Sequence, residues 1–384
     1  MNYRILGKTG LKVSSLGFGC MRLPMEGGRV NDALAVPLLQ RAVELGVNYF
    51  DTAVGYCGKD SQRAIGDALH DVRSQIVIST KNPVKTVEEA GEWRKNLEDS
   101  LRLLRTDYID IYLSHGLNWA AYEKGLKVKG GLLEAFLKAK QEGLVRHIGF
   151  SAHDTPANII KLAAEGVFES VTLQYNLLDR ANEPVIAFLK EHNIGAVVMG
   201  PVGGGRLANQ TVEGEAGGAV SAQLAIKFVL SNPNVTLALS GMSDLKILED
   251  NVAIASSEET ALSAAEAAAV QRASQSQARL LEVYCTACGY CMPCPSGVDI
   301  PGSFTLAQLD EAYGMGELAK KRYADMKGKA RARFCVECGQ CLEKCPQKLQ
   351  IPDRMRRLVE RLDPDANRPA IEAQTLKVSQ GDGG

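Results

Sequence analysis

Residues 1 to about 256 alternate short apolar runs with longer amphipathic runs, and this alternation limits the possible folds more than any other feature of the chain. Strands separated by helices pair in parallel, and the helices must then cover the faces of the sheet. An apolar content of 45% supplies a sizeable core. The predicted strands are residues 14–19, 47–52, 76–80, 109–114, 146–150, 170–174, 196–199 and 235–239, and the predicted helices include 32–45, 89–104, 131–141, 184–192 and 222–230.

The number of strand–helix units indicates which α/β fold the chain adopts. Eight units within about 250 residues predict a closed (β/α)8 TIM barrel. A doubly wound open sheet is the alternative. Its glycine fingerprint, G-x-G-x-x-G after the first strand, is absent from the start of this chain, so the barrel is the preferred prediction.

Polar residues stand where the predicted strands end. In a parallel barrel these ends meet at one face, and barrel enzymes bind their substrates there. A single histidine or serine at such a position is more often structural than catalytic, so the prediction depends on their joint placement. The residues are Asp51, Lys81, His115, Ser151, Gln174 and Asn176, followed by the glycine run 203–205 after the seventh strand.

Two cysteine runs near the C-terminus hold eight of the ten cysteines. The second run, residues 335–346, has the spacing C-x2-C-x2-C-x3-C-P and resembles bacterial-type ferredoxins, whose thiolates bind [4Fe–4S] clusters. The first run, residues 285–295, is one residue shorter before its last cysteine. Together the runs predict two [4Fe–4S] clusters in a small, mainly helical, ferredoxin-like domain with a role in electron transfer.

The ligands are assigned across the two runs, because in two-cluster ferredoxins the cysteine before the proline binds the other cluster. Zinc sites and disulfides are the alternatives. Two runs that each end in Cys-Pro are not typical of zinc sites, and thiols so closely spaced pair poorly with one another. The assignment gives Cys285, Cys288, Cys291 and Cys345 to one cluster, and Cys294, Cys335, Cys338 and Cys341 to the other.

Several stretches of the first 256 residues resemble the aldo/keto reductases. They are residues 6–13 (LGKTGLKV), 49–56 (YFDTAVGY), 78–81 (ISTK), 107–115 (DYIDIYLSH) and 174–180 (QYNLLDR). The specific part of this resemblance is the set Asp51, Tyr56, Lys81 and His115. With the cysteine runs, it points to the branch of that family that carries a C-terminal ferredoxin-like domain with two clusters. The resemblance implies an oxidoreductase that interconverts a carbonyl and an alcohol.

The resemblance gives each of the four residues a task. Hydride transfer to a carbonyl leaves an alkoxide oxygen that needs a proton, and Tyr56 is the expected donor. An unperturbed tyrosine has a pKa of about 10, which the ammonium of Lys81 is expected to lower. Asp51 is the expected buried partner that holds Lys81 charged. His115 is expected to hydrogen-bond the substrate oxygen and orient it.

The resemblance also implies a nicotinamide cofactor, NADP or NAD. Backbone N–H groups of a glycine loop after strand seven can approach a pyrophosphate. The residues assigned to the cofactor are Ser151 and Gln174 for the carboxamide, Asn176 as a weaker candidate for the same group, Gly203, Gly204 and Gly205 for the pyrophosphate, and Asn251 for the adenine.

The preference for NADP over NAD is open. Gly241 and Ile247 stand where members of the family carry the cations that recognise the 2′-phosphate. Lys246 is the available substitute, because a point charge needs no fixed fork geometry.

The chain is predicted to divide into a barrel over residues 1–256, a linker helix over 257–284, a two-cluster domain over 285–364 and a disordered tail over 365–384. The net charge of −1 makes neither nucleic acid nor a membrane an expected partner. No apolar run is long enough to span a membrane, and the first residues do not open a signal peptide. We therefore expect a cytoplasmic protein, since a reducing compartment keeps cluster thiolates intact.

A basic stretch lies between the cysteine runs, with seven Lys and Arg in residues 320–333. Its ordinary explanation is a solvated helical face. The alternative is a docking patch for an acidic electron-carrier protein.

Two functions fit these features. The first is an oxidoreductase of aldo/keto reductase type whose clusters exchange electrons with a partner. The second is a redox relay or sensor in which the barrel is a scaffold and the clusters carry electrons or stabilise the fold. Hydride carries two electrons, whereas a cluster passes one electron at a time. A flavin could split the electron pair, so it is a further candidate cofactor. The sequence names neither the substrate nor the oligomeric state.

Overall fold

The structure, a computed structural model, describes residues 1–203, 221–275, 285, 289–312, 316–345 and 347–363. The chain forms two compact units, Met1–Gln277 and Ala278–Gly384, here called unit 1 and unit 2. The predicted tail over 365–384 and residues 276–284 of the predicted linker lie outside the described residues. None of the described helices combines the length and the apolar character that crossing a bilayer requires.

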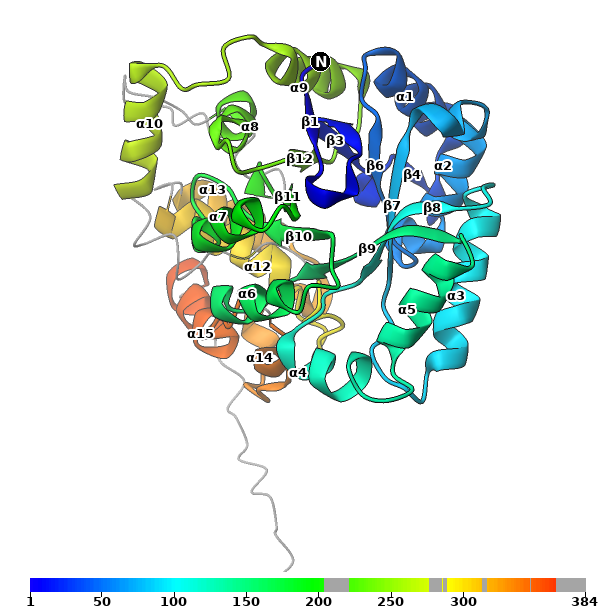
Figure 1. Cartoon of the computed structure of the whole chain (residues 1–384). Coiled ribbons are helices and arrows are strands. Elements are labelled where there is room, and N and C mark those ends of the chain that lie inside the picture. Colours follow the sequence, from blue (N-terminus) through cyan, green and yellow to red (C-terminus); the bar gives the residue numbers. More distant parts are fainter. Residues whose placement is uncertain (204–220, 276–284, 286–288, 313–315, 346, 364–384) are drawn as a thin grey trace, which may run out of the picture. The chain divides into compact units, whose positions relative to one another are not determined.

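Unit 1 is a closed barrel of eight parallel strands in the order β10-β11-β12-β3-β6-β7-β8-β9, which confirms the predicted architecture (Figure 1). Each predicted strand agrees with an observed strand to within two residues at either end. The barrel strands are β3 (Leu16–Gly19), β6 (Tyr49–Asp51), β7 (Val77–Asn82), β8 (Ile109–Ser114), β9 (Val145–Ala152), β10 (Ser170–Gln174), β11 (Gly195–Met199) and β12 (Leu237–Ser240).

Helices surround this barrel. The five predicted helices appear as α1 (Asp32–Glu44), α3 (Ala90–Leu103), α5 (Leu132–Gln141), α7 (Glu183–Glu191) and α8 (Ala222–Ser231). Further helices are α2 (Ser61–Leu69), α6 (Pro156–Ala164), α9 (Leu245–Ser256) and α10 (Ala264–Gln275). The sequence did hold a signal for α6, because Thr155 caps it by accepting from the N–H of Asn158 and Pro156 opens it.

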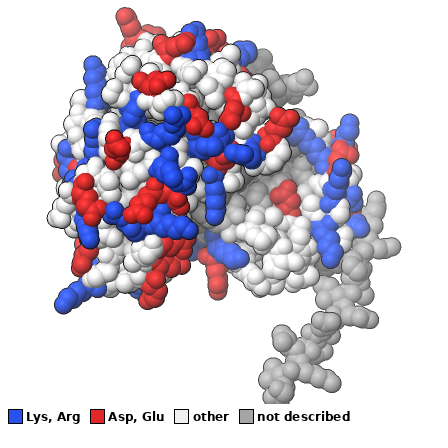
Figure 2. All heavy atoms as spheres, turned by 90° about the vertical axis from the view of Figure 1, so that its right-hand side faces the viewer, with Lys and Arg blue, Asp and Glu red and all other residues white. Residues whose placement is uncertain are grey.

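Charges of both signs are interspersed on the side of the barrel that carries α1, α2, α3 and α5 (Figure 2). Several of them are paired, such as Arg63 with Asp32 at 2.8 Å and Arg94 with Glu142 at 2.5 Å. This face therefore has the character of a solvated surface.

Strand alternation decides which side chains fill the barrel. On β7, Val77, Ser79 and Lys81 share one side, because successive side chains point to opposite faces. Val77 packs into the interior core with Ile111, and Lys81 then lies near the C-terminal end of the strand. The interior is tightly filled, since a Cβ at Gly17 would come within 2.8 Å of the side chain of Leu239.

Unit 2 is mainly helical, with α12 (Ile300–Ala307), α13 (Gly316–Asp325), α14 (Gln340–Lys344) and α15 (Ile351–Leu362). Its core combines helix side chains such as Phe304 and Met355 with the buried thiols Cys285 and Cys345. A core this small stabilises a domain only marginally unless disulfides or bound metal add to its stability. Two of the predicted cluster ligands are therefore part of the packing itself.

Candidate functional site

Four side chains predicted to carry the chemistry meet at the C-terminal end of the barrel strands. The Lys81 ammonium donates to Asp51 Oδ1 at 2.5 Å and to the carbonyl of Thr52 at 2.7 Å. Lys81 Nζ lies 4.8 Å from the centre of the Tyr56 ring. The Tyr56 and His115 rings contact edge to face, with their centres 5.9 Å apart.

Lys81 and Asp51 form a buried ion pair, with side chains only 2% and 5% exposed. Burial acts to lower the pKa of Lys81, but the charges of Asp51 and Tyr56 outweigh it and raise the pKa above its ordinary value. Lys81 is thus a fixed positive charge beside the Tyr56 ring. Removing either partner would leave an uncompensated buried charge.

The expected lowering of the Tyr56 pKa is wrong for this structure. Burial raises the pKa of Tyr56, and the charge of Lys81, which acts to lower it, offsets only part of that effect. The sequence revealed the partner charge but not how deeply the phenol is buried. Tyr56 is therefore protonated at neutral pH, which suits a proton donor.

His115 is neutral in this environment. Burial lowers its pKa to about 3, and Lys81, Lys85 and His153 add to the effect. Burial also lowers the pKa of His153 to about 4. A neutral imidazole still donates one hydrogen bond, so His115 can bind an oxygen without carrying charge.

The two histidines predict that unit 1 loses stability in acid. The folded chain keeps both neutral down to about pH 4, whereas the unfolded chain takes up protons below about pH 6.5. Stability should therefore fall as the pH falls from about 6.5 to about 4, and His153→Gln should flatten that fall. Urea midpoints at several pH values measure this, because both reporters, Trp93 and Trp119, lie in unit 1.

His192→Gln is the matched control, because His192 is exposed directly after the end of α7. It should leave the pH dependence unchanged. Equal slopes for the wild type and the His153 variant would contradict the prediction.

The backbone after Tyr56 takes an uncommon conformation. Cys57, Gly58 and Lys59 have φ angles of 51°, 65° and 74°, in the left-handed region that residues other than glycine rarely adopt. Each such non-glycine residue costs on the order of 1–3 kcal/mol and persists only where its surroundings hold it. The turn that positions Tyr56 therefore needs an anchor.

Asp60, directly after this turn, is that anchor. Its carboxylate accepts from the N–H of Val30 at 3.0 Å and from Arg63 at 2.7 and 3.0 Å. Val30 belongs to a hairpin of β4 (Met25–Glu26) and β5 (Arg29–Val30), and Arg63 to α2. The hydrogen bond from Arg63 holds the pKa of Asp60 far below its usual range. Asp60 was not among the predicted site residues, because no local pattern pairs residues 30 and 60.

Asp60→Ala is expected to destabilise unit 1 by about 1–3 kcal/mol, because it leaves the Arg63 guanidinium and the Val30 N–H without their shared partner. Urea unfolding followed by tryptophan fluorescence measures the loss. Asp67→Ala is the matched control, since Asp67 accepts from the same Arg63 at 2.9 Å but is 41% exposed. The control should cost about 0.5 kcal/mol or less. Equal losses in the two variants would show that Asp60 anchors nothing.

Ser151 and Gln174 lie at the ends of the neighbouring strands β9 and β10. The Ser151 hydroxyl oxygen accepts from the N–H of Gly116 at 2.9 Å, which leaves its proton for another bond. Gln174 Nε2 is buried and has no hydrogen-bond partner among the described residues. Gly200 makes room beside it, since a Cβ there would lie 2.5 Å from Nε2. An unpaired buried donor and a serine hydroxyl on adjacent strands fit a carboxamide group.

The two asparagines have partners within the barrel. Asn176 serves its own loop, because its oxygen accepts from two N–H groups there and its nitrogen donates to the Gly200 carbonyl at 3.0 Å. Asn251 is buried on α9 and donates to Ser240 Oγ at 3.1 Å. Asn176 is therefore a loop-forming residue rather than a free amide.

The glycine loop and the cations around the expected phosphate sites are only partly described. Gly203 is buried, while Gly204 and Gly205 lie outside the described residues. Lys246 forms an ion pair with Asp250 at 2.8 Å. Arg22, which was not among the predicted site residues, packs beside Gly241, since its side-chain carbons would lie 3.6 Å from a Cβ at that position.

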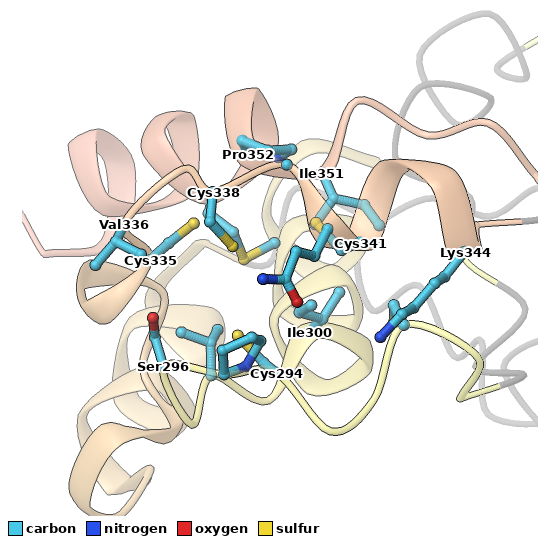
Figure 3. A pocket seen from close by; sticks show the side chains of 16 residues that line it. Cys294, Ser296, Ile300, Cys335, Val336, Cys338, Cys341, Lys344, Ile351 and Pro352 are labelled. Atoms are coloured by element: carbon cyan, nitrogen blue, oxygen red, sulfur yellow. The ribbon is translucent and has the colours of Figure 1, made fainter. Parts of the chain in front are cut away.

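Five predicted cluster ligands line one cavity of unit 2 (Figure 3). They are Cys291, Cys294, Cys335, Cys338 and Cys341, and they surround an empty volume of about 430 Å³, which includes the part open to solvent. Within the described ranges, no three His, Cys, Asp or Glu side chains are placed to bind a single metal ion. The thiols thus border a hollow, which is the arrangement that a multi-atom cluster requires.

A second cavity, of about 320 Å³, is lined by Cys285, Cys291 and Cys345. Cys288, the fourth predicted ligand there, lies outside the described residues. Cys291 lines both cavities. Each cavity therefore has thiols from both cysteine runs. Cys294 of the first run lines the cavity of Cys335, Cys338 and Cys341, and Cys345 of the second run lines the cavity of Cys285.

Comparisons with known proteins match both units. A sequence model of the aldo/keto reductase family matches residues 15–275, and a model of the 4Fe-4S dicluster domain matches residues 284–350. L-galactose dehydrogenase from Arabidopsis thaliana is 28% identical over 281 residues, which cover 65% of this chain and 86% of that protein. Pyridoxine 4-dehydrogenase from Escherichia coli is 30% identical over 263 residues, covering 63% and 89%. The structure of aldo-keto reductase AKR11C1 from Bacillus halodurans (holo form) aligns with a TM-score of 0.60 at 29% identity, covering 71% of this chain and 96% of that one.

Proposed function

The chain belongs to the aldo/keto reductase family and carries a 4Fe-4S dicluster domain, and we propose that it reduces a carbonyl or oxidises an alcohol with Tyr56 as general acid or base. Two [4Fe–4S] clusters exchange electrons with a partner protein. The observation that carries the proposal is the buried Lys81–Asp51 pair beside the Tyr56 ring, with a neutral His115 at the edge of that ring.

The chemistry at this site is a proton transfer paired with a hydride, which a bound nicotinamide supplies. As charge develops on the substrate oxygen, Tyr56 gives it the phenolic proton. Lys81 stabilises the negative charge left on the phenolate, and Asp51 keeps Lys81 charged and in place. His115 donates a hydrogen bond to the same oxygen and orients it. In the reverse direction the phenolate takes the proton from an alcohol.

The cofactor is NADP or NAD. We assign Ser151 and Gln174 to its carboxamide, because the orphaned Gln174 Nε2 and the Ser151 hydroxyl fit that group. The remaining assigned positions are Gly203, Gly204 and Gly205 for the pyrophosphate, Asn251 for the adenine, and Arg22 beside Gly241 as a candidate cation for the 2′-phosphate.

The clusters connect this enzyme to one-electron chemistry. Cys294, Cys335, Cys338 and Cys341 hold one cluster, and Cys285, Cys288, Cys291 and Cys345 hold the other. Hydride moves two electrons together, whereas a cluster passes one at a time. A flavin, bound to this chain or to its partner, is the group that would split the pair.

Anaerobic spectroscopy with NADPH tests the proposal. The purified protein should be brown, bind NADPH and reduce a carbonyl. Cluster reduction by NADPH alone would place both units on one electron path, and its absence would assign the clusters to a separate donor. Gln174→Leu should weaken NADPH binding, and Gln40→Leu, at an exposed residue of α1, should not. A wild type that binds no nicotinamide would instead support the relay or sensor function with the barrel as scaffold.

A further inference from the structure

The two thiol cavities differ in how much of their lining reaches solvent. The cavity around Cys294, Cys335, Cys338 and Cys341 has five exposed lining residues, Pro295, Val336, Cys338, Gln340 and Lys344. Val336 is 69% exposed. None of the described residues that line the other cavity is exposed, and its Cys285 and Cys345 are only 8% and 7% exposed. Exposed side chains thus surround the first cavity, whereas the described lining of the second is buried or half-buried.

One lysine lines the exposed cavity and another packs on a loop next to it. Lys344 lines it across from Val336 (Figure 3). Gly297 lies on the loop that follows Cys294. A Cβ at Gly297 would lie 3.2 Å from Lys329 Cβ, so the aliphatic part of the Lys329 side chain packs on this loop. Within the described part of the chain, no ion pair joins Lys329 or Lys344 to a carboxylate. Both charges are therefore available to a partner.

Much of the predicted basic stretch is already engaged elsewhere. Lys320 pairs with Glu317 at 2.9 Å, and Arg333 pairs with Asp363 at 3.5 Å. Arg331 donates to backbone carbonyls of its own segment at 2.6 and 3.0 Å. The available charge at the cavity thus comes from Lys329 together with Lys344, which lies outside that stretch.

We propose that Pro295, Val336, Cys338, Gln340 and Lys344, with Lys329 beside them, form a docking face for an acidic one-electron carrier protein. This inference rests on the proposed electron exchange and adds the place where it occurs. An apolar centre between cations complements a carrier whose redox group lies in an apolar patch ringed by carboxylates. Glu337 of the same loop is paired with Arg356 at 3.8 Å, so it offsets little of the positive charge.

The docking face lies next to the thiols of Cys294, Cys335, Cys338 and Cys341, which would hold one cluster. That cluster would take one electron from a reduced carrier, which would be oxidised by one electron with no bond formed or broken.

Stopped-flow reduction of the intact, cluster-loaded protein tests the docking face, with a reduced acidic ferredoxin and a reduced flavodoxin as carriers. The pair Lys329→Glu and Lys344→Glu should lower the second-order rate constant about tenfold or more at low ionic strength. Val336→Asp should lower it as well. Added salt should slow the wild type and have less effect on the charge-reversed pair. Dithionite, a small reductant that needs no docking face, should still reduce the clusters of every variant completely.

The matched control is the pair Lys321→Glu and Arg322→Glu, which makes the same change in net charge at exposed residues of α13. Figure 1 shows α13 and α14 at opposite ends of unit 2. The control should keep most of the wild-type rate, and an equal loss in both pairs would overturn the proposed location. If the wild type exchanges electrons but the docking-face variants match it, only the docking face fails. If neither carrier reduces the wild type while dithionite does, the proposed exchange fails and the docking face with it.

Discussion

Replacing Tyr56 by Phe is expected to lower kcat/KM for carbonyl reduction by about 10²–10⁴-fold, because the phenyl ring keeps the shape of the site but has no proton to give. Lys81 would remain paired with Asp51, so the fold should persist. Anaerobic steady-state assays with NADPH and a panel of aldehydes and ketones measure the loss. The visible spectrum of the same sample shows whether the clusters are intact.

Tyr3→Phe is the control for this change. It removes one surface hydrogen bond, from the Tyr3 hydroxyl to the Gly46 carbonyl at 2.9 Å, and should leave activity unchanged. A Tyr56→Phe enzyme with full activity would remove Tyr56 from the mechanism.

The pH dependence of the two directions gives a separate check on the same residue. Because burial raises the pKa of Tyr56, the phenol stays protonated throughout the neutral range. Its contribution to reduction should therefore be constant there and decline only as the pH rises through the raised pKa. Alcohol oxidation needs the phenolate, so its rate should rise as the pH rises toward the raised pKa of Tyr56.

Removing iron from the protein is expected to unfold unit 2 and leave unit 1 folded. Structural metal contributes on the order of 10 kcal/mol to the folding of small domains. In unit 2 the thiols of Cys285 and Cys345 lie in the apolar core itself, so each empty cavity leaves that core without its filling and its cross-links. Anaerobic chelation should therefore lower the helical circular dichroism and expose residues 285–363 to protease. Tryptophan fluorescence should not change, since Trp93 and Trp119 both lie in unit 1.

Single cysteine variants separate a structural role of the clusters from a relay. Cys345→Ala, at a buried core thiol, should lose iron and helical signal together. Cys338→Ala, at an exposed thiol, tests the relay: lost activity with an intact fold would favour electron transfer, and unfolding would favour a structural role. Cys57→Ala, outside both runs, should keep its iron. An iron-free protein that retains its helical signal and protease resistance would refute the structural role.

Much of the fold followed from local pattern. The predicted and observed bounds coincide for β8 and β10, because buried parallel strands leave an apolar run that turn residues interrupt on both sides. The sequence also predicted that Lys81 stands where its strand ends, and in the structure strand alternation puts it on the same side as Val77, inside the barrel. The helices α2 and α6 were not among the predicted ones, although Thr155 as a cap and Pro156 as a helix-opening proline mark the start of α6.

The sequence by itself determined the order of strands and helices, the chemical identity of Asp51, Tyr56, Lys81 and His115, and the spacing of the thiols. These properties are local, so composition and spacing carry them. Only the tertiary structure decided that burial outweighs Lys81 in setting the Tyr56 pKa and that Asp60 anchors the turn behind it. It also decided that exposed residues line one thiol cavity and that none of the described residues lining the other is exposed. Burial and contacts between distant residues depend on how the elements pack, and no short stretch of sequence contains that information.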